Sequence, residues 1–422
     1  MKYVIATLGC KVNTYESNVM SDILENEGYT KTAENADVVI INTCSVTNTA
    51  DVKSKKLIRQ MIRKNSNAYV IVTGCLSQVK AEEIFNIEGV NLVIGNKNKS
   101  KILDYIKNKE NKIDIYDLSS TKFETMKLNN FNKTRAFVKI QDGCNNFCSY
   151  CIIPYTRGNV RSKDKKDVLT EIETLVKKGH KEIVLTGIHT GNYGVEFEDY
   201  DFADLLKDIV KIKGLERLRI SSIEMNEIND RVLDVIKNND ILVDHMHIPL
   251  QSGSDTILKL MNRKYNLEQF KNKIETLRKI RKDMSITTDV IVGFPYETEE
   301  LFNETINFIK QINFSKLHVF PYSKREGTKA ATFDNQIDEE TKKERVRTLL
   351  KLSKELEEKY ALKFINKELE FLPEIYKDGY LIGHTGNYLL IKAKGNIEDL
   401  NKSKNVIIKT VDNGYCKADI ID

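Results

Sequence analysis

A chain of 422 residues with 41% hydrophobic residues is long enough for roughly two to four domains, each with its own core. Its net charge of +5 permits a nucleic-acid partner without requiring one, since dedicated nucleic-acid-binding domains are usually more basic. No apolar run approaches the roughly 20 residues that span a bilayer, and no signal peptide is recognisable, which predicts cytoplasmic localisation and no membrane partner.

The first segment, residues 1–125, alternates short apolar runs with amphipathic helical patterns. The runs are KYVIATLG, DVVIINT, AYVIVTG and VNLVIGN. Short buried strands that alternate with helices indicate βαβ units around a parallel sheet. The sequence therefore predicts an α/β domain here.

Three cysteines directly follow three of these predicted strands. Cys10 ends ATLGC, Cys44 ends VIINTC and Cys75 ends VIVTGC. Ligands of open parallel sheets bind outside the carboxyl ends of the strands, so the three thiols are expected at one edge. A single cysteine of this kind is more often a buried core residue, but three at equivalent positions favour a ligand site.

The second segment, residues 133–333, contains six predicted strands with amphipathic helices between them. The strands are RAFVKIQDG, KEIVLTG, RLRISSIE, VDHMHIPLQSG, SITTDVIVGFP and KLHVFPYS. Six such repeats predict a partial (β/α)6 barrel, whose site lies at the C-terminal ends of the strands. His245 and His247 alternate on one strand, and barrel lining or core packing explains them better than metal ligation. The polar or small residues at strand ends are Gly187, Ser222, Glu224, Gln251 and Gly293.

The first barrel strand leads into QDGCNNFCSYC, which holds Cys144, Cys148 and Cys151 within eight residues. Zinc sites usually have paired C-x2-C ligands and a second pair or histidines nearby, but the next histidine is His180. Three thiolates on one loop could instead hold three irons of a cubane cluster and leave the fourth iron open. The seventh cysteine, Cys416, belongs to neither group and is expected to be structural.

Two further segments complete the chain. Residues 334–362 combine charged residues with an apolar stripe and predict a packed linker helix. Residues 364–422 alternate short strands with glycine and asparagine turns, a pattern that predicts a small β-barrel.

The cysteine loop, the three upstream cysteines and the domain order resemble the radical S-adenosylmethionine (SAM) methylthiotransferases over essentially the whole chain. The resemblance implies a flavodoxin-like N-terminal methylthiotransferase domain, a radical SAM barrel and a TRAM-like RNA-binding barrel. It also implies two [4Fe–4S] clusters. The loop cysteines would hold the cluster that binds and reductively cleaves SAM, while the upstream cysteines would hold an auxiliary cluster that delivers sulfur.

Further site residues follow from the same resemblance. Arg157 and Arg161 come directly after the cluster loop and are candidate RNA-binding residues, whereas the basic stretch from Lys53 to Lys64 is better explained as a solvated helix face. Tyr150 would lie near the adenine of SAM, and a packing role explains it equally well. The implied cofactor-binding residues are Tyr150, Gly187, His189, Ser222, Glu224, Gln251 and Gly293.

The stretch TLGCKVNTYES around the first cysteine resembles the MtaB-type branch of the family. That branch methylthiolates C2 of N6-threonylcarbamoyladenosine at position 37 of tRNA. The implied partners are a tRNA anticodon stem-loop and an electron donor such as flavodoxin or ferredoxin. N6-isopentenyladenosine of tRNA and an aspartate of a ribosomal protein remain alternative substrates. A zinc-bearing RNA-binding protein is the alternative from a different class.

Overall fold

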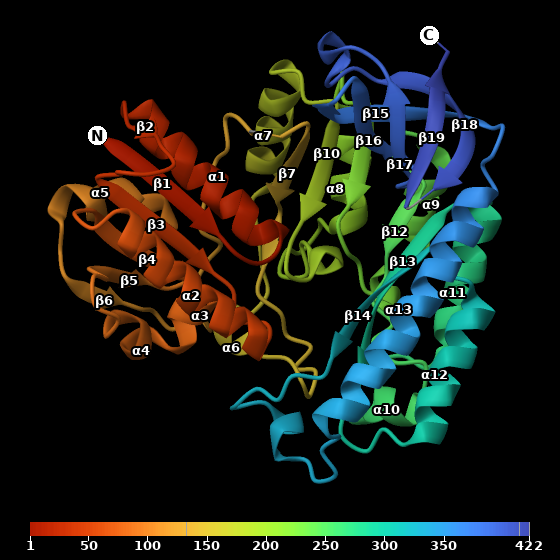
Figure 1. Ribbon diagram of the computed structural model, residues 1–422, viewed down its shortest axis with the longest axis horizontal. Coiled ribbons are helices and arrows are strands. Elements are labelled where there is room, and N and C mark those ends of the chain that lie inside the picture. Colours follow the sequence, from red (N-terminus) through yellow and green to blue (C-terminus); the bar gives the residue numbers. More distant parts are fainter. Residues whose placement is uncertain (132, 413, 422) are drawn as a thin grey trace.

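The computed structural model describes residues 1–131, 133–412 and 414–421, which form three groups of strands with their helices (Figure 1). The N-terminal part, red to orange, is an open parallel sheet, and the middle of the chain is a partial barrel of parallel strands. The C-terminal part, blue, is a closed barrel. This arrangement confirms the predicted α/β fold with a small C-terminal barrel.

The N-terminal sheet has the strand order β2-β1-β3-β4-β5-β6, in which every pair of neighbours is parallel. Apolar clusters lie on both of its faces, so β3 and β4 are buried at every position. The edge strands β2 and β6 are too short for the sequence pattern to predict. The strands are β1 (Lys2–Thr7), β2 (Thr30–Lys31), β3 (Val38–Thr43), β4 (Tyr69–Gly74), β5 (Leu92–Ile94) and β6 (Lys112–Asp114). The helices are α1 (Lys11–Asn26), α2 (Asn48–Lys64), α3 (Cys75–Val79), α4 (Ala81–Phe85) and α5 (Ile102–Asn108).

The middle of the chain alternates parallel strands with helices that cover them from outside (Figure 1). The strands are β7 (Arg135–Lys139), β10 (Glu182–Thr186), β11 (Arg217–Ile220), β12 (His245–His247), β13 (Ser285–Val292) and β14 (Lys316–Pro321), with a small antiparallel pair of β8 (Gln141–Asp142) and β9 (Arg161–Ser162). The helices are α6 (Ile153–Arg157), α7 (Lys165–Lys177), α8 (Phe202–Ile209), α9 (Asp230–Asn238), α10 (Asp255–Leu260), α11 (Leu267–Ile280) and α12 (Glu299–Ile312). Short 3-10 helices occur at Lys99–Lys101, Thr190–Asn192, Met225–Glu227, Lys329–Thr332 and Ile397–Asp399.

The six barrel strands do not form one continuous ladder. They form two three-stranded sheets, β11-β10-β7 and β12-β13-β14. An isolated bridge between Leu218 and Leu242 joins them. The chain therefore meets β11 at Leu242, before β12 begins, and the two strands then separate.

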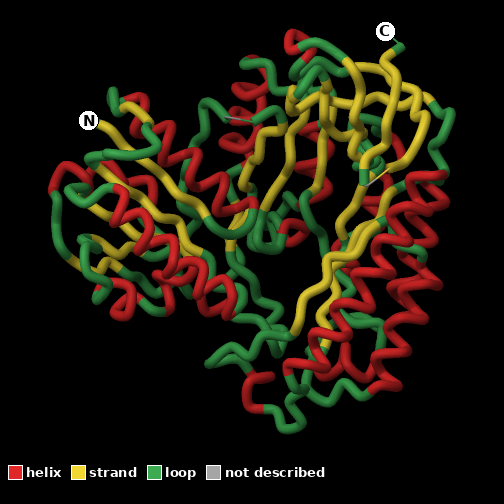
Figure 2. The backbone as a smooth tube through the Cα atoms, viewed as in Figure 1, coloured by secondary structure: helices red, strands yellow, loops and turns green. Residues whose placement is uncertain are grey.

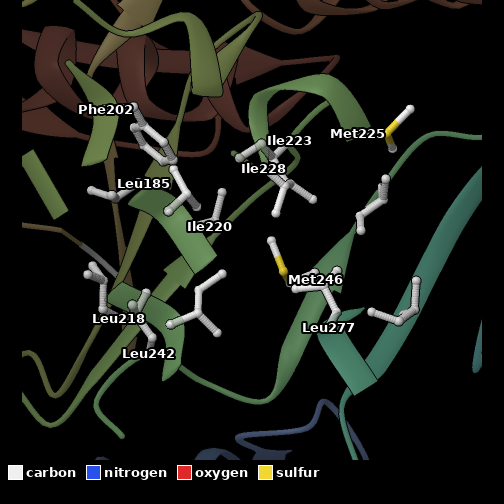
Figure 3. Packing of buried hydrophobic residues seen from close by; sticks show 14 of the residues in the cluster. Leu185, Phe202, Leu218, Ile220, Ile223, Met225, Ile228, Leu242, Met246 and Leu277 are labelled. Carbon is white, nitrogen blue, oxygen red and sulfur yellow. The ribbon is translucent and has the colours of Figure 1, made fainter. Parts of the chain in front are cut away.

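Apolar side chains of the strands pack outward against the barrel helices. Figure 3 shows Leu185 of β10 and Ile220 of β11 near Phe202 of α8, and Met246 of β12 near Leu277 of α11. Each of these five side chains is at most 4% exposed. Burial of one such side chain contributes about 1.5–3 kcal/mol, so this layer fixes the strands that carry the site at their ends.

The C-terminal barrel closes in the order β15-β16-β17-β19-β18. Buried Cys416 lies in its apolar core, as expected for a structural cysteine. Helix α13 (Glu339–Leu362) precedes this barrel and packs along β14 (Figures 1 and 2). Among the described residues, no helix combines the length and apolarity needed to cross a membrane. The strands are β15 (Glu368–Lys377), β16 (Tyr380–Thr385), β17 (Leu390–Lys394), β18 (Lys404–Asp412) and β19 (Tyr415–Ile420).

The C-terminal barrel docks on the N-terminal ends of the radical-barrel strands. Its Tyr388 ring stacks on His245 of β12, with ring centroids 4.5 Å apart. The guanidinium groups of Arg135 and Arg219 lie over the same ring, 5.4 and 4.8 Å from its centroid. His247 shares the Thr287 hydroxyl with His245, so both histidines line the barrel.

Candidate functional site

The three upstream cysteines lie directly after neighbouring strands of the N-terminal sheet. Cys10 follows β1, Cys44 follows β3 and Cys75 follows β4, and these strands are adjacent in the order β1-β3-β4. Strands β2 and β3 lie on opposite sides of β1, so the strand order reverses at β1. Doubly wound sheets bind their ligands at such a switch point. The structure therefore brings these residues, the auxiliary triad, to one edge of the sheet.

Glycines position two of these cysteines. Gly9 has φ +118°, and a Cβ there would lie 3.2 Å from the Cβ of Cys44. Gly74 has φ +102°, and a Cβ there would lie 2.4 Å from the carbonyl oxygen of Thr43. Only glycine adopts such a backbone without strain, so the tight turns before Cys10 and Cys75 depend on it.

The thiols of the auxiliary triad influence one another electrostatically. Burial raises the pKa of Cys44 to about 11, and negative charge on Cys75 or Cys10 acts in the same direction. Cys10, by contrast, is exposed at the edge of the sheet. A thiol such as that of Cys44 is protonated at neutral pH and ionises when a metal binds.

The second group of cysteines lies on the loop after β8, and backbone hydrogen bonds fix that loop. The amide of Cys144 donates to the carbonyl of Gly158 at 3.0 Å, and the amide of Cys151 donates to that of Cys148 at 3.0 Å. Ser149 between them donates its hydroxyl to the carbonyl of Leu260 at 2.8 Å. These contacts hold the three thiols, the loop triad, on one short turn.

A cation contacts the loop triad from the following part of the barrel. Arg263 places Nη1 at 3.3 Å from the Sγ of Cys148, and its Nη2 pairs with the carboxylate of Glu224. Tyr265 lies under the same guanidinium, with its ring centroid 5.0 Å away. Arg263 therefore links a cluster-loop sulfur to a carboxylate that the sequence predicts to bind cofactor.

His189 contacts the loop triad from the turn after β10. Its Nδ1 lies 3.7 Å from the Sγ of Cys144, and its Nε2 pairs with the carboxylate of Glu227. Burial lowers the pKa of His189, but Cys144 and Glu227 together raise it to about 10. His189 is therefore a cation at neutral pH beside the cysteine loop.

A polar cavity of about 210 Å³ opens beside the loop triad. It brings Cys148 together with the predicted residues His189 and Glu224, and its charged groups suit a zwitterionic ligand such as an amino acid. Its lining residues are Asn146, Cys148, His189, Asn192, Glu224, Asn226, Glu227, Asn262, Arg263, Lys264 and Tyr265.

Two other predicted residues lie next to this cavity without lining it. Tyr150 packs its ring edge-on against Phe294, with centroids 6.5 Å apart. Burial raises the pKa of its hydroxyl, which also lies within electrostatic range of Arg263. Gly187 packs against Gln141, whose side chain accepts a hydrogen bond from the amide of His189 at 2.7 Å. Both residues therefore support the loop and the turn that flank the cavity.

The remaining predicted cofactor residues are not gathered at the cavity. Ser222, which follows β11, is half-buried. Gln251 has φ +67° and forms an isolated β-bridge with Val290. Gly293 lies under helix α13, where an added Cβ would be 2.3 Å from the Cγ of Lys342. The structure therefore places these three residues on the strand ends but apart from the polar cavity.

The expectation that Arg157 and Arg161 contact RNA is corrected by their burial. Arg157 is 0% exposed and Arg161 is 7% exposed. Arg157 pairs with Glu16 of α1 at 2.5 Å, and Arg161 pairs with Asp142 at 3.2 Å. Both guanidinium groups are held inside the protein by carboxylates, so neither is presented to a phosphate.

Helix α6 connects the two triads physically. It begins two residues after Cys151 and packs against α3, which begins with Cys75. Asn96 donates to the carbonyl of Thr156 in α6 at 2.8 Å and lies 3.7 Å from the Sγ of Cys75. The two cysteine groups therefore flank one rigid element.

The two triads supply six free thiols in all. Among the described residues, no three His, Cys, Asp or Glu side chains lie close enough to hold one metal ion. Each triad offers three thiols, which leaves one iron of a cubane without a protein ligand.

Comparison with known proteins identifies the family. Residues 138–309 match the radical SAM superfamily, and residues 2–95 match the uncharacterized protein family UPF0004. The chain is 45% identical to the threonylcarbamoyladenosine tRNA methylthiotransferase MtaB of Bacillus subtilis, over 97% of this chain and 93% of that protein. The chain belongs to the radical SAM methylthiotransferase family.

Other relatives support the same assignment. A Clostridium novyi protein named tRNA-2-methylthio-N(6)-dimethylallyladenosine synthase is 36% identical over 100% of this chain and 96% of its own. Among solved structures, the radical SAM methyltransferase TsrM of Kitasatospora setae is similar, with a TM-score of 0.56 and 13% identity over 75% of this chain and 72% of that one. At that identity the likeness concerns the fold alone.

Family membership confirms an enzyme that uses SAM and a [4Fe–4S] cluster, as members of this methylthiotransferase family do. Several residues around its site escaped the sequence analysis, because no short motif marks them. Arg263, Glu227, Asn13, Glu16 and Asn96 reach the site only through the tertiary fold. One available signal is the group of polar residues, Glu16 and Asp22 among them, that interrupts the buried face of helix α1.

Proposed function

We propose that this methylthiotransferase converts N6-threonylcarbamoyladenosine at position 37 of tRNA to its 2-methylthio form, using two [4Fe–4S] clusters and SAM. The observation that carries the proposal is the 45% identity to the Bacillus subtilis protein named for this nucleoside, against 36% for relatives named for dimethylallyladenosine. The stretch around Cys10, which resembles the threonylcarbamoyladenosine branch, supports the same substrate.

The chain's own residues have distinct parts in this proposal. The loop triad holds the SAM-binding cluster, and the auxiliary triad holds the second one. When bound, these groups supply the radical, the methyl group and the sulfur that the modification requires. Arg263, Glu224 and His189 orient the amino-acid end of SAM in the polar cavity, and α6 keeps the two triads at a fixed separation.

Aromatic side chains at the cysteine loop offer a surface for the RNA. Phe147 and Tyr155 are 51% and 54% exposed, and their rings meet edge-on with centroids 6.4 Å apart. Proteins recognise unstacked RNA bases by stacking them on such rings. These residues take the place of Arg157 and Arg161 as candidates for contact with an anticodon loop. A flavodoxin or ferredoxin would supply the electrons.

The proposal is tested by mass spectrometry of nucleosides from tRNA of cells with and without the gene. We expect 2-methylthio-N6-threonylcarbamoyladenosine to disappear and its unmethylthiolated precursor to accumulate. Return of the wild-type gene restores the nucleoside, whereas a gene with Cys148→Ala does not. Loss of the methylthiolated isopentenyl nucleoside instead would transfer the same chemistry to the other tRNA substrate, and no change in either would point to the ribosomal aspartate.

Metal analysis tests the cofactor part of the proposal. Two cubanes require about eight iron and eight sulfide per chain. A content of one zinc without sulfide would overturn the enzyme proposal in favour of a zinc-bearing RNA-binding protein.

A further inference from the structure

A group of six charged side chains is buried between the N-terminal sheet and the radical barrel. Each is at most 7% exposed. Two come from the N-terminal part of the chain and four from the barrel, so the group spans the contact between them. Its members, the buried charge network, are Glu16, Lys99, Lys139, Asp142, Arg157 and Arg161.

Two carboxylates organise the buried charge network. Glu16 contacts Lys139 at 2.8 Å and Arg157 at 2.5 Å, and it also pairs with Lys99. Asp142 contacts Lys139 at 2.6 Å, and the two arginines of the network lie 3.2 Å or more from it. Every cation of the network therefore has a carboxylate neighbour, but these neighbours are shared.

The buried charge network has more positive than negative charge. Four cations face two carboxylates, and no other carboxylate in the described part of the chain pairs with these cations. Uncompensated charge inside a protein costs several kcal/mol, so an excess of two cations implies a further anion nearby. No resident side chain of the described residues supplies it.

Arg157 carries this excess charge toward the auxiliary triad. Its Nη2 donates to the Oδ1 of Asn13 at 2.7 Å, and the same Oδ1 lies 3.8 Å from the Sγ of Cys10. Its Nε has no hydrogen-bond partner among the described residues, although the side chain is fully buried.

We propose that Arg157 is a positioning residue of the auxiliary site: its guanidinium offsets the negative charge of the cluster on Cys10, Cys44 and Cys75, and thereby raises the reduction potential of that cluster. The Nε–H group, which has no partner among the described residues, is available to donate a hydrogen bond to a sulfur atom of the cluster or of a ligand on the iron that no cysteine binds. Hydrogen bonds and charges around a cluster are the protein's main means of setting its potential. This inference rests on the proposed function, because it requires a cluster on the auxiliary triad.

The test uses the full-length chain with Cys144, Cys148 and Cys151 changed to alanine, so that a reconstituted cluster occupies only the auxiliary triad. Its midpoint potential is measured by anaerobic titration with electron paramagnetic resonance detection. The comparison is made at the midpoint potential of the chain that carries only the three alanine substitutions. At that potential, Arg157→Gln is expected to lower the ratio of reduced to oxidised cluster about tenfold, which corresponds to about 59 mV for one electron. Arg157→Lys keeps the charge and is expected to recover most of that ratio.

Arg161→Gln is the matched control. It removes the same charge from the same network, but Arg161 points to Asp142 and not to a cysteine, so its effect is expected to be at least threefold smaller. Equal effects of the two glutamine variants, or no effect of either, would overturn the inference. If the chain with Cys144, Cys148 and Cys151 changed to alanine assembles no cluster, both the proposed function and this inference are contradicted. If it assembles a cluster whose midpoint potential does not depend on Arg157, only this inference is contradicted.

Glu16→Gln provides a test of opposite sign. It removes a negative charge from the network near Cys10, so the auxiliary cluster is expected to become easier to reduce. General damage to the fold would not shift the midpoint potentials of Arg157→Gln and Glu16→Gln in opposite directions. If Arg157→Gln does not fold, Glu16→Gln still tests the inference. A lower midpoint potential in Glu16→Gln would contradict a charge-based role.

Discussion

Arg263 illustrates how one side chain joins the parts of this site. It contacts a sulfur of the loop triad and the carboxylate of Glu224, and it lies on the wall of the polar cavity. Its guanidinium fork is suited to holding two groups at a fixed angle, which a lysine ammonium does not do. Arg263 therefore connects the loop triad to the cavity in which we propose that the amino-acid end of SAM binds.

Substitution of Arg263 by methionine should slow reductive cleavage of SAM by roughly a hundredfold, because misplacement of reacting groups by about 1 Å costs that much. Iron content should remain near that of the wild type, since the three cysteines are intact. The production of 5′-deoxyadenosine with a chemical reductant measures the effect.

Two variants complete this measurement. Arg263→Lys should retain part of the activity, because it keeps the charge but loses the fork. Lys259→Met removes a charge from the exposed side of the neighbouring helix α10 and should change the rate less than twofold. Wild-type rates in Arg263→Met would show that the arginine plays no part in SAM cleavage.

Single residues also show where sequence reasoning stops. Two arginines directly after a cluster loop look the same in sequence whether they face RNA or the interior. Arg157 is buried because Glu16, 141 residues earlier in the chain, supplies its partner. No local pattern links two residues so far apart, whereas the positions of the six cysteines at strand ends and on one loop follow from local features of the sequence.

At the scale of secondary structure, the parallel strands decide where the auxiliary triad lies. A cysteine one to three residues after each of β1, β3 and β4 reaches the same edge because these strands are neighbours. The alternation of apolar runs and helices was sufficient to predict this arrangement. The edge strand β2, with two residues, and the interruption between β11 and β12 depend on contacts that a local pattern does not contain.

The turn between β4 and α3 gives a prediction at this scale. Gly74→Ala adds a Cβ against the carbonyl of Thr43 at a positive φ, so it should destabilise the protein by about 3 kcal/mol. Because Cys75 follows directly, iron held by the auxiliary triad should also be lost. Urea unfolding and iron analysis measure the two effects.

Gly28→Ala is the matched comparison for that turn. Gly28 has φ +81°, but an added Cβ would meet no atom within 4 Å. Its substitution should cost about 1 kcal/mol of backbone strain and leave the iron content unchanged. A cost as large as that of Gly74→Ala would mean that the contact with Thr43 is unimportant.

At the scale of the molecule, polar contacts hold the C-terminal barrel on the radical barrel. Arg135 of β7 pairs with Glu374 of β15 at 2.9 Å, and Arg217 of β11 pairs with Glu370 at 2.7 Å. His384 contacts the same carboxylate of Glu374 at 2.5 Å. The interface therefore depends on ionised carboxylates and has a predictable response to acid.

Glu374 gives a pH prediction for this interface. Burial raises its pKa, but His384 and Arg135 outweigh burial and hold the pKa below the usual 4.5. A carboxylate whose pKa is lower in the folded than in the unfolded protein stabilises the folded state, and this contribution is fully present above about pH 4.5. It is lost as the pH falls through the pKa of the carboxylate in the folded protein. Thermal unfolding of the wild type between pH 6 and 3.5 should show the loss.

Glu374→Gln isolates this contribution from that of other carboxylates. The variant should be less stable than the wild type by about 2 kcal/mol at pH 6, because Arg135 loses its charged partner. The difference should decrease as the pH falls below about 4.5 and through the lowered pKa of Glu374. A constant difference across this range would exclude titration of Glu374 as the cause.

The two cysteine triads differ in how far apart their members stand along the chain. The loop triad lies within eight residues, so its thiols are neighbours even in an unfolded chain. The auxiliary triad is spread from Cys10 to Cys75 and exists only after three strands have paired. With the two clusters of the proposed function, we expect iron to be captured at the loop triad before the barrel closes, whereas the auxiliary triad has to wait for a finished sheet.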